Sequence, residues 1–250
     1  MKLDISHIEF SRKDILRNIK LPTSLTPDLA EFIGIMVGDG HLGLYFREKE
    51  RITSSEIKIA CNSNERVYIE HIMKLFEGLF GISLKIYKDK RSDTSLLTCY
   101  SKCIVQFLNQ TCKIPINNKV SSVKISLLIQ NGSNKIKTAF IRGLADTDFA
   151  VTFRNRIGKG HISPIIKAHF KSANLIRDLE QLFKELGFNY CCCYNTIKHD
   201  KRFEDTTLHS IYLNGKKNFK KWNEEIGFSN PKFQKKVKKW LKDGNCPPGY

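Results

Sequence analysis

Two aspartates end two similar stretches of small and apolar residues, and this repetition is the first sign of chemistry in the chain. Residues 32–40 read FIGIMVGDG, and residues 141–149 read IRGLADTDF. Asp39 and Asp148 stand at matching places, 109 residues apart. If both stretches are helices that face each other, the two carboxylates meet at helix ends that are already negative. A divalent cation relieves that repulsion, and carboxylate and carbonyl oxygens with bound water suit Mg²⁺.

Small residues four positions apart let two helix backbones approach closely. The first stretch has Gly34 and Gly38, and the second has Gly143 and Thr147 at the matching positions. Gly38 and Thr147 directly precede the two acids, so their backbone carbonyls are the predicted companions of the carboxylates at a metal site. Asp146 lies two residues before the second acid, points away from it on a helix, and is interpreted as a capping or structural acid.

The same order of elements follows each stretch, which predicts a pseudo-symmetric duplication with αββαββα in each half. Apolar residues alternate in the predicted strands and recur with helical spacing in the predicted helices. The central helix of each half stops at a glycine, Gly81 or Gly187, as helix C-termini prefer. The predicted strands are 41–47, 56–61, 82–88 and 96–101, then 149–154, 165–170, 190–195 and 208–213. The further predicted helices are 64–79, 104–110, 174–186 and 219–226.

This pattern predicts an α+β fold with two pseudo-symmetric repeats, each holding a four-stranded antiparallel sheet. The predicted organisation is a first repeat with an N-terminal extension at 1–117, a linker at 118–134 and a second repeat at 135–250. The polar segment 198–206 is predicted to be a mobile connection between two strands.

The charge of the chain indicates a polyanionic partner. Its 250 residues include 42 Lys and Arg against 25 Asp and Glu, a net charge of +17. Such an excess fits nucleic acid or an anionic membrane surface. No apolar stretch approaches the ~20 residues that span a bilayer, and the N-terminus does not resemble a signal peptide. We therefore expect a soluble intracellular protein of the cytoplasm, nucleoid or an organelle. The eight cysteines, with no paired zinc spacing, are interpreted as small reduced hydrophobes.

The two acid-ending stretches resemble the LAGLIDADG motif of homing endonucleases, in the single-chain form with two motifs. The second stretch is the closer match, and the first keeps the glycine and the terminal Asp-Gly. The resemblance implies an intron-encoded, monomeric enzyme whose two sheets form a saddle over the major groove of double-stranded DNA. It implies that Asp39 and Asp148 bind Mg²⁺ or Mn²⁺, with Ca²⁺ binding without supporting cleavage. It further implies hydrolysis of both strands of a long asymmetric site, across the minor groove, leaving 3′ overhangs.

The resemblance also implies roles for polar residues around the acids. A lysine after the last strand of each half assists at the phosphate in this family. Lys119 and Lys232 match one another in the duplicated frame, each following an asparagine-containing turn. Asn64 and Lys171, near the ends of the second strands, correspond to positions that order water.

Strand alternation predicts which side chains face DNA. Leu42, Leu44 and Phe46 are expected to pack on helices, and Glu56 is expected to face outward. Lys216, Lys217 and the predicted helix at 235–239 are expected to contact phosphates. The residues expected to face base edges are His41, Tyr45, Arg47, Lys58, Asn62, Thr152, Arg154, Lys167 and His169.

Two other functions fit the same sequence. One is an RNA-binding intron maturase on this fold, with or without nuclease activity. The other is a DNA-binding protein without catalysis, although the retention of both acids argues against it. An intein is not expected, because the chain has no N-terminal Cys or Ser and no terminal His-Asn.

Overall fold

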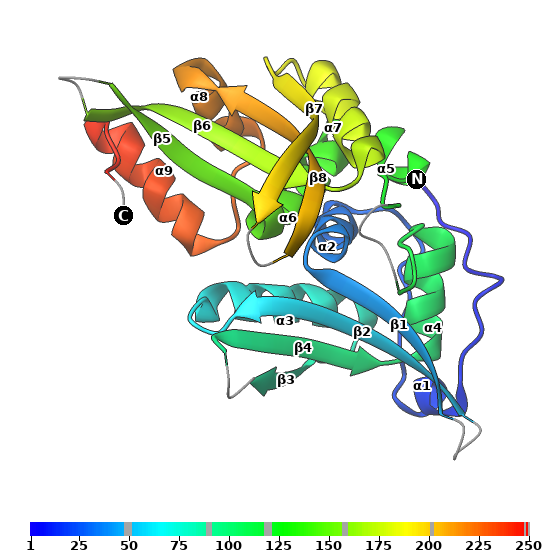
Figure 1. Ribbon diagram of the computed structural model, residues 1–250. Helices are drawn as coiled ribbons and strands as arrows, with labels where there is room; N and C mark the ends of the chain where they lie inside the picture. Colours follow the sequence, from blue (N-terminus) through cyan, green and yellow to red (C-terminus); the bar gives the residue numbers. More distant parts are fainter. Residues whose placement is uncertain are drawn as a thin grey trace. The chain divides into compact units, whose positions relative to one another are not determined.

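The computed structural model describes residues 1–47, 52–88, 92–117, 122–156, 160–200, 203–247 and 249. Its contacts divide the chain into two compact units. Unit 1 comprises Met1–Lys119 and Ser126–Leu144, and unit 2 comprises Val120–Ile125 and Ala145–Tyr250. Each unit is built on one four-stranded antiparallel sheet (Figure 1). The predicted α+β fold with two repeats is confirmed. The boundaries of the repeats in the sequence stay a prediction.

Unit 1 has the strand order β1-β2-β4-β3, with helices packed on the sheet. A π-helical turn, Phe107–Thr111, extends α4. The strands are β1 (Gly40–Arg47), β2 (Ile52–Asn62), β3 (Lys85–Lys88) and β4 (Thr94–Tyr100). The helices are α1 (Arg12–Leu16), α2 (Pro27–Val37), α3 (Arg66–Phe80), α4 (Lys102–Gln106) and α5 (Leu127–Gln130).

Unit 2 repeats the arrangement with the strand order β5-β6-β8-β7. Its strands are β5 (Phe149–Arg156), β6 (Gly160–Phe170), β7 (Cys191–Asp200) and β8 (Phe203–Asn214). Its helices are α7 (Ala173–Glu185), α8 (Gly215–Glu225) and α9 (Pro231–Asp243). Helix α6 (Asn134–Asp148) belongs to unit 1 as far as Leu144 and to unit 2 from Ala145. No helix of the described ranges is long and apolar enough to cross a membrane.

Local sequence signals explain where the helices begin and end. Thr26 caps α2 through a bond from the Leu29 backbone N–H, and a proline fills the first helical position. The Ser172 side chain caps α7 by accepting a hydrogen bond from the Leu175 backbone N–H. Helix α3 ends at Gly81, which adopts the left-handed conformation with φ 72° that glycine takes without steric cost.

An aromatic cluster forms the centre of each core. In unit 1, the Phe32 ring of α2 packs on Phe76 and Phe80 of α3, with centroids 5.6 and 5.8 Å away. In unit 2, the buried Trp222 of α8 contacts Phe149 at 5.9 Å and Phe183 at 6.2 Å. The stretches that end in Asp39 and Asp148 are therefore attached to a large aromatic core.

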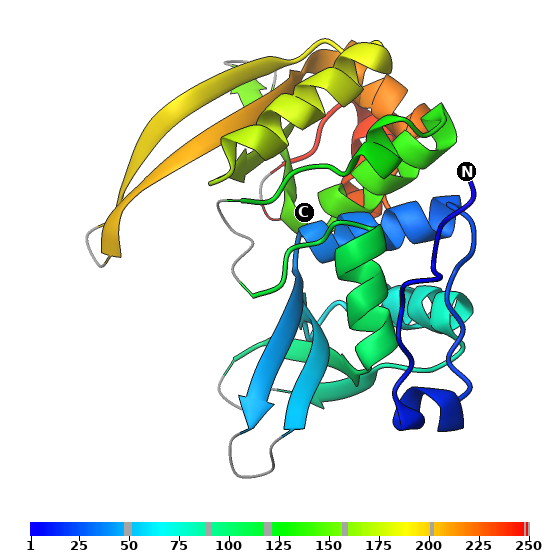
Figure 2. The ribbon, with the colours of Figure 1, turned by 90° about the vertical axis from the view of Figure 1, so that its right-hand side faces the viewer.

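Two predictions about the strands are wrong, for a common reason. Leu44 and Phe46 were expected to pack on helices, yet they are 40% and 65% exposed. β4 pairs with β2 only from Glu56 onward, so the outer part of the β1–β2 hairpin is two-stranded. Likewise, the polar segment predicted as a mobile connection contains the ends of β7 and β8. Lys198 pairs with Thr206 there, and Figure 2 shows the two-stranded arm that results. Backbone pairing sustains such an arm without a core beneath it.

Within unit 1, α2 and α6 approach so closely that only glycine fits. A Cβ atom at Gly34 would lie 2.2 Å from the Phe140 carbonyl oxygen. A Cβ atom at Gly143 would lie 2.0 Å from the Glu31 carbonyl oxygen. The predicted role of these two small residues in close helix packing is confirmed.

We predict opposite effects of one methyl group at two helical glycines. Gly143→Ala should lower the free energy of unfolding by ~2 kcal/mol, because the methyl group overpacks backbone against backbone. Gly78→Ala should raise it by about 0.5–1 kcal/mol, because a Cβ there meets nothing within 4 Å and alanine favours the helix. Urea denaturation of both variants checks the pair. Equal stability of the Gly143 variant and the parent would contradict the close approach.

Candidate active site and nucleic-acid interface

Asp39 lies in the short turn between α2, which ends at Val37, and β1, which begins at Gly40. The Gly38 N–H closes the last turn of α2 by donating to the Gly34 carbonyl at 3.0 Å. The Asp39 carbonyl then accepts the Ala60 N–H at 3.2 Å, which joins it to β2. The residue is exposed. Its carboxylate is thus presented at the negative end of a helix whose backbone is fixed on both sides.

Asp148 ends α6 and has an additional polar contact. It is half-buried, and the Thr147 hydroxyl donates to its Oδ2 at 3.1 Å. Phe149 follows Asp148 directly, and its ring is buried against Phe170 and Trp222. The phenyl group therefore points into the core of unit 2 and leaves the end of the helix accessible.

The donor set of these helix ends suits a hard divalent cation. If a cation binds there, each end would offer one carboxylate and the backbone carbonyl of the residue before it, Gly38 or Thr147. Nowhere in the described residues do three or more His, Cys, Asp and Glu side chains gather into a metal-binding group. A cation bound here would take few protein oxygens and complete its shell with water or phosphate, as Mg²⁺ prefers. The residues present therefore fit the expected metal.

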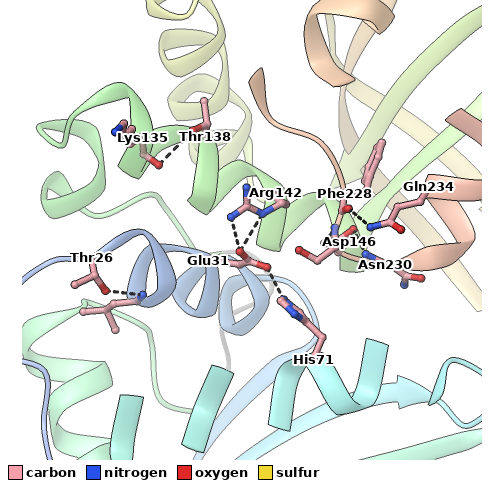
Figure 3. Close-up of polar contacts among 12 residues, drawn as sticks. Thr26, Glu31, His71, Lys135, Thr138, Arg142, Asp146, Phe228, Asn230 and Gln234 are labelled. Carbon is pink, nitrogen blue, oxygen red and sulfur yellow. Dashed lines mark hydrogen bonds and ion pairs between the residues drawn. The ribbon is translucent and has the colours of Figure 1, made fainter. Parts of the chain in front are cut away.

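The structural role predicted for Asp146 is confirmed. Its carboxylate holds the segment that precedes Lys232, the lysine predicted to act in the second repeat. Asp146 is 1% exposed, and its carboxylate accepts the backbone N–H groups of Ser229 at 2.8 Å and Asn230 at 3.1 Å (Figure 3). The fully buried Asn230 side chain then accepts the Lys232 N–H at 3.1 Å and caps α9. This clamp, formed by Asp146, Ser229 and Asn230, attaches the start of α9 to the last turn of α6, where Asp148 lies.

The first repeat holds the matching segment by other means. Val37 stands where the second repeat has Asp146, at the same offset of 109 residues. Here Asn117 continues a parallel bridge between Ile116 and Leu42, and its N–H donates to the Leu42 carbonyl at 2.7 Å. Lys119 lies outside the described residues, so its predicted place stays a prediction.

A buried carboxylate that the sequence reading missed ties α2 to α3 and α6 within unit 1. Glu31 is 3% exposed, and Arg142 donates to its Oε2 through Nη2 at 2.6 Å and Nε at 2.9 Å. His71 Nε2 lies 2.7 Å from Oε1 (Figure 3). An acid inside the otherwise apolar α2, with an arginine inside the second motif stretch, was the signal available in the sequence. Such a buried pair fixes helix register more than it adds stability.

The predicted DNA-facing residues of unit 1 share one face of its sheet. His41 Nε2 lies 3.1 Å from the Tyr45 hydroxyl, and Lys58 Nζ lies 5.6 Å from the centre of the Tyr45 ring. Glu56 was expected to face outward but is 3% exposed. Lys58 Nζ lies 2.7 Å from Glu56 Oε2, and a hydrogen bond between Tyr100 and Glu56 raises the pKa of Tyr100. The acid is thus covered and its charge offset on a face expected to meet phosphates. The side chain of Arg47 lies outside the described residues.

The corresponding face of unit 2 offers neutral and basic groups. Lys167 and His169 alternate with the buried Ile166 and Ala168 of β6, so they point away from the helices. His169 Nδ1 lies 2.7 Å from the Ser210 hydroxyl. Partial burial, together with nearby lysines, lowers the pKa of His169 and so favours the neutral imidazole, which both donates and accepts hydrogen bonds. Thr152 and Arg154 of β5 fall on this face by the same alternation.

Five other predicted residues lie at strand ends or on a helix. Asn62 is the last residue of β2, whereas Asn64 follows in an exposed turn and donates its N–H to the Asn62 side chain at 2.9 Å. Lys171 directly follows β6 and is exposed. Lys216 and Lys217 belong to α8, which packs on the covered face of the sheet. The structure therefore does not bring these two lysines together with Lys167 and His169.

Comparison with known proteins agrees with this geometry. Residues 135–227 match the model of the LAGLIDADG-like domain family. The homing endonuclease I-DmoI, solved in complex with DNA and Mn, is 18% identical, and the match covers 82% of this chain and 98% of that one with a TM-score of 0.55. The I-LtrWI LAGLIDADG homing endonuclease, solved bound to target DNA, is 13% identical over 87% of this chain and 92% of its own, with a TM-score of 0.54. The predicted resemblance to two-motif LAGLIDADG chains is confirmed, and the chain has their fold.

A curated relative shows how little a shared segment says about the activity of a whole protein. Glutamine–fructose-6-phosphate aminotransferase from Methanocaldococcus jannaschii is 22% identical over 213 residues. The match takes in 84% of this chain but only 17% of that enzyme. The aminotransferase activity of the relative is therefore not assigned to this chain.

We predict that the Asp146 clamp is a main support of α9. Asp146→Asn keeps the shape but turns an amide NH₂ toward one of two backbone N–H donors, which should cost ~2 kcal/mol of unfolding free energy. The matched change Asp243→Asn, at the surface pair with Lys239 near the end of α9, should leave the free energy of unfolding nearly unchanged. Amide hydrogen exchange at Ser229 and Asn230 should accelerate in the first variant alone. Unchanged exchange there would contradict the clamp.

Proposed function

We propose that this chain is a monomeric, metal-dependent homing endonuclease that hydrolyses both strands of a long asymmetric DNA site and leaves 3′ overhangs. The observation that carries the proposal is the repeated acid: in each repeat, an aspartate at or just after the end of a helix leads directly into a strand of a four-stranded sheet. The two-motif fold and the charge of +17 support it.

The chain's own residues would orient the metal and the DNA. Asp39 and Asp148 would hold the cation, with the Gly38 and Thr147 carbonyls as further oxygens. The Thr147 hydroxyl donates to the Asp148 carboxylate and helps to orient it. A bound Mg²⁺ or Mn²⁺ supplies an activated water and offsets charge on the phosphate and leaving oxygen. The structures of I-DmoI were solved with DNA and Ca or Mn, which supports a divalent cation here.

The exposed sheet faces would bind the duplex. Lys58 and His41 in unit 1, and Lys167, His169 and Arg154 in unit 2, present donors and acceptors of the kind that read base edges in the major groove. I-LtrWI was solved bound to its target DNA, which supports double-stranded DNA as the partner. Selection of cleaved sites from a random duplex library with Mg²⁺ tests activity and yields the target. Binding without cleavage of any site would favour a non-catalytic DNA-binding protein.

Removal of either acid should separate cleavage from binding. Asp39→Asn and Asp148→Asn should each lower the single-turnover rate on the selected site by at least ~10²–10³-fold, comparable to loss of a main electrostatic contact. Duplex affinity should hold or rise slightly, because a negative charge near phosphate is removed. Rates at saturating DNA and affinities in Ca²⁺ check both parts. Full-rate cleavage by either variant would sink the metal assignment.

The lysine held by the clamp should act on rate more than on affinity. Lys232→Met is expected to lower the single-turnover rate by ~10²-fold with little change in salt slope, because charge stabilisation develops mainly in the transition state. Lys119→Met should behave alike. Lys184→Met, an exposed lysine in the last turn of α7, serves as the control and should cleave at the parent rate. If the Lys119 and Lys232 variants both cleave at the parent rate, the two lysines have no part in catalysis.

A further inference from the structure

Two of the eight cysteines differ from the rest in their exposure. Cys191 and Cys193 are exposed, and Cys192 between them is half-buried. The interpretation as small hydrophobes is therefore wrong for the two exposed residues. Both lie at the start of β7, the edge strand of its sheet (Figure 1). The other five cysteines are buried, as expected of small hydrophobes: Cys61, Cys99, Cys103, Cys112 and Cys246.

The strand register shows which face of the sheet carries Cys193. Residues directly opposite each other in neighbouring antiparallel strands point to the same face. Cys193 lies opposite Ser210 of β8, and Ser210 lies opposite His169 of β6. The Ser210 hydroxyl is 2.7 Å from His169 Nδ1, so these side chains share one face. We call the face of this sheet that carries Lys167 and His169 the open sheet face, and Cys193 belongs to it.

Cys191 lies in the next row of the open sheet face. It lies opposite Tyr212, which lies opposite Lys167. The Tyr212 ring meets the His169 ring edge-on, with centroids 5.8 Å apart. The Asn214 side chain donates to Cys191 Sγ at 3.3 Å. A duplex bound to the open sheet face would therefore pass next to both exposed thiols.

Cys192 points to the other face and provides an internal comparison. It lies opposite Ile211, which is 1% exposed and belongs to the core. Burial and the neighbouring Glu180 of α7 raise the pKa of Cys192. Because the thiolate is the reactive form of cysteine, this environment makes Cys192 a poor nucleophile.

The exposed thiols cannot form a disulfide with each other. Residues two apart on one face of a strand are separated by ~6.6 Å. A disulfide brings its two Cβ atoms to about 3.5–4.5 Å. Exchange therefore requires a disulfide from outside the chain. Lys167 and Lys198 both act electrostatically on His169, so the positive charge at this face favours an anionic disulfide.

We propose that Cys191 and Cys193 form a modification site, at which exchange with a small anionic disulfide of the glutathione type prevents duplex binding to the open sheet face. The cysteine thiolate attacks one sulfur of glutathione disulfide, whose S–S bond breaks as the bond between protein and glutathione forms. The second glutathione leaves as a thiolate and takes up the proton that the cysteine lost. Each attached group brings two carboxylates and one ammonium, and hence a net negative charge. The inference rests on the proposed duplex site.

The first measurement locates the modified thiols without DNA. The native full chain is treated with glutathione disulfide, and peptide mapping by mass spectrometry identifies the modified cysteines. Modification is expected at Cys191 and Cys193 and at no buried cysteine. The variant that combines Cys191→Ser with Cys193→Ser should remain unmodified, whereas Cys192→Ser should be modified like the parent. Modification confined to other cysteines, or no modification, would overturn the proposal.

The second measurement connects the modification to DNA. Each protein is titrated in Ca²⁺ with a labelled pool of random-sequence duplexes, before and after reduction with dithiothreitol. The modified parent and the modified Cys192→Ser variant should bind at least ~10-fold more weakly than their reduced forms, because like charges are placed against phosphates. The treated double-serine variant should bind equally well before and after reduction. Unchanged affinity after modification of both thiols, or an equal loss in the double-serine variant, would overturn the proposal.

Failure of the proposed function gives a different result. If the reduced parent binds no duplex, the proposed function is wrong and the effect of the thiols on DNA binding is excluded with it. The peptide map needs no DNA, so it distinguishes this outcome from a chain that binds duplex but whose exposed thiols do not react.

Discussion

An acid at the C-terminal end of a helix is the constraint on which the arrangement of each repeat depends. The last carbonyls of α2 and α6 make these ends negative, yet Asp39 and Asp148 stand there. The surrounding structure holds them in place: the Ala60 N–H of β2 donates to the Asp39 carbonyl, the Thr147 hydroxyl donates to the Asp148 carboxylate, and Phe149 next to Asp148 is buried. A position that disfavours a carboxylate electrostatically, and is nevertheless built rigidly, has a physical use when a cation occupies it.

The two repeats meet this constraint with different supports. The second repeat uses a buried carboxylate, Asp146, to bind two backbone N–H groups before α9. The first repeat has Val37 at that place and holds its matching segment by pairing Asn117 with β1. Loss of the Asp146 carboxylate would leave two backbone N–H donors of unit 2 unsatisfied. In unit 1 a backbone hydrogen bond from Asn117 to Leu42 holds the matching segment without a buried charge. A shared fold therefore does not imply equal sensitivity to substitution.

Periodicity in the sequence was enough to predict the order of elements, because alternation and helical spacing report which residues meet the core. Periodicity did not predict exposure correctly where a side chain lies beyond the core or is covered by polar neighbours. Phe46 has the pattern of a core residue but lies beyond the four-stranded part of its sheet, and Glu56 is buried by Lys58 and Tyr100 rather than by apolar packing. The Glu31–Arg142 pair was missed because it joins residues 111 positions apart. Local patterns carry no information about such partners, and Lys119 remains a prediction from the duplicated frame alone.

The distribution of charge over unit 2 separates two ways of meeting a nucleic acid. The open sheet face mixes Lys167 with a neutral His169 and the Ser210 hydroxyl, groups that both donate and accept hydrogen bonds. Such groups discriminate between base edges. Helix α9 instead repeats one cation, with no acid among residues 231–242, and a lysine that contacts phosphate carries no sequence information. Because discrimination between base edges requires both donors and acceptors, whereas contact with phosphate requires only positive charge, the net charge of the chain alone does not show which of its surfaces suits base recognition.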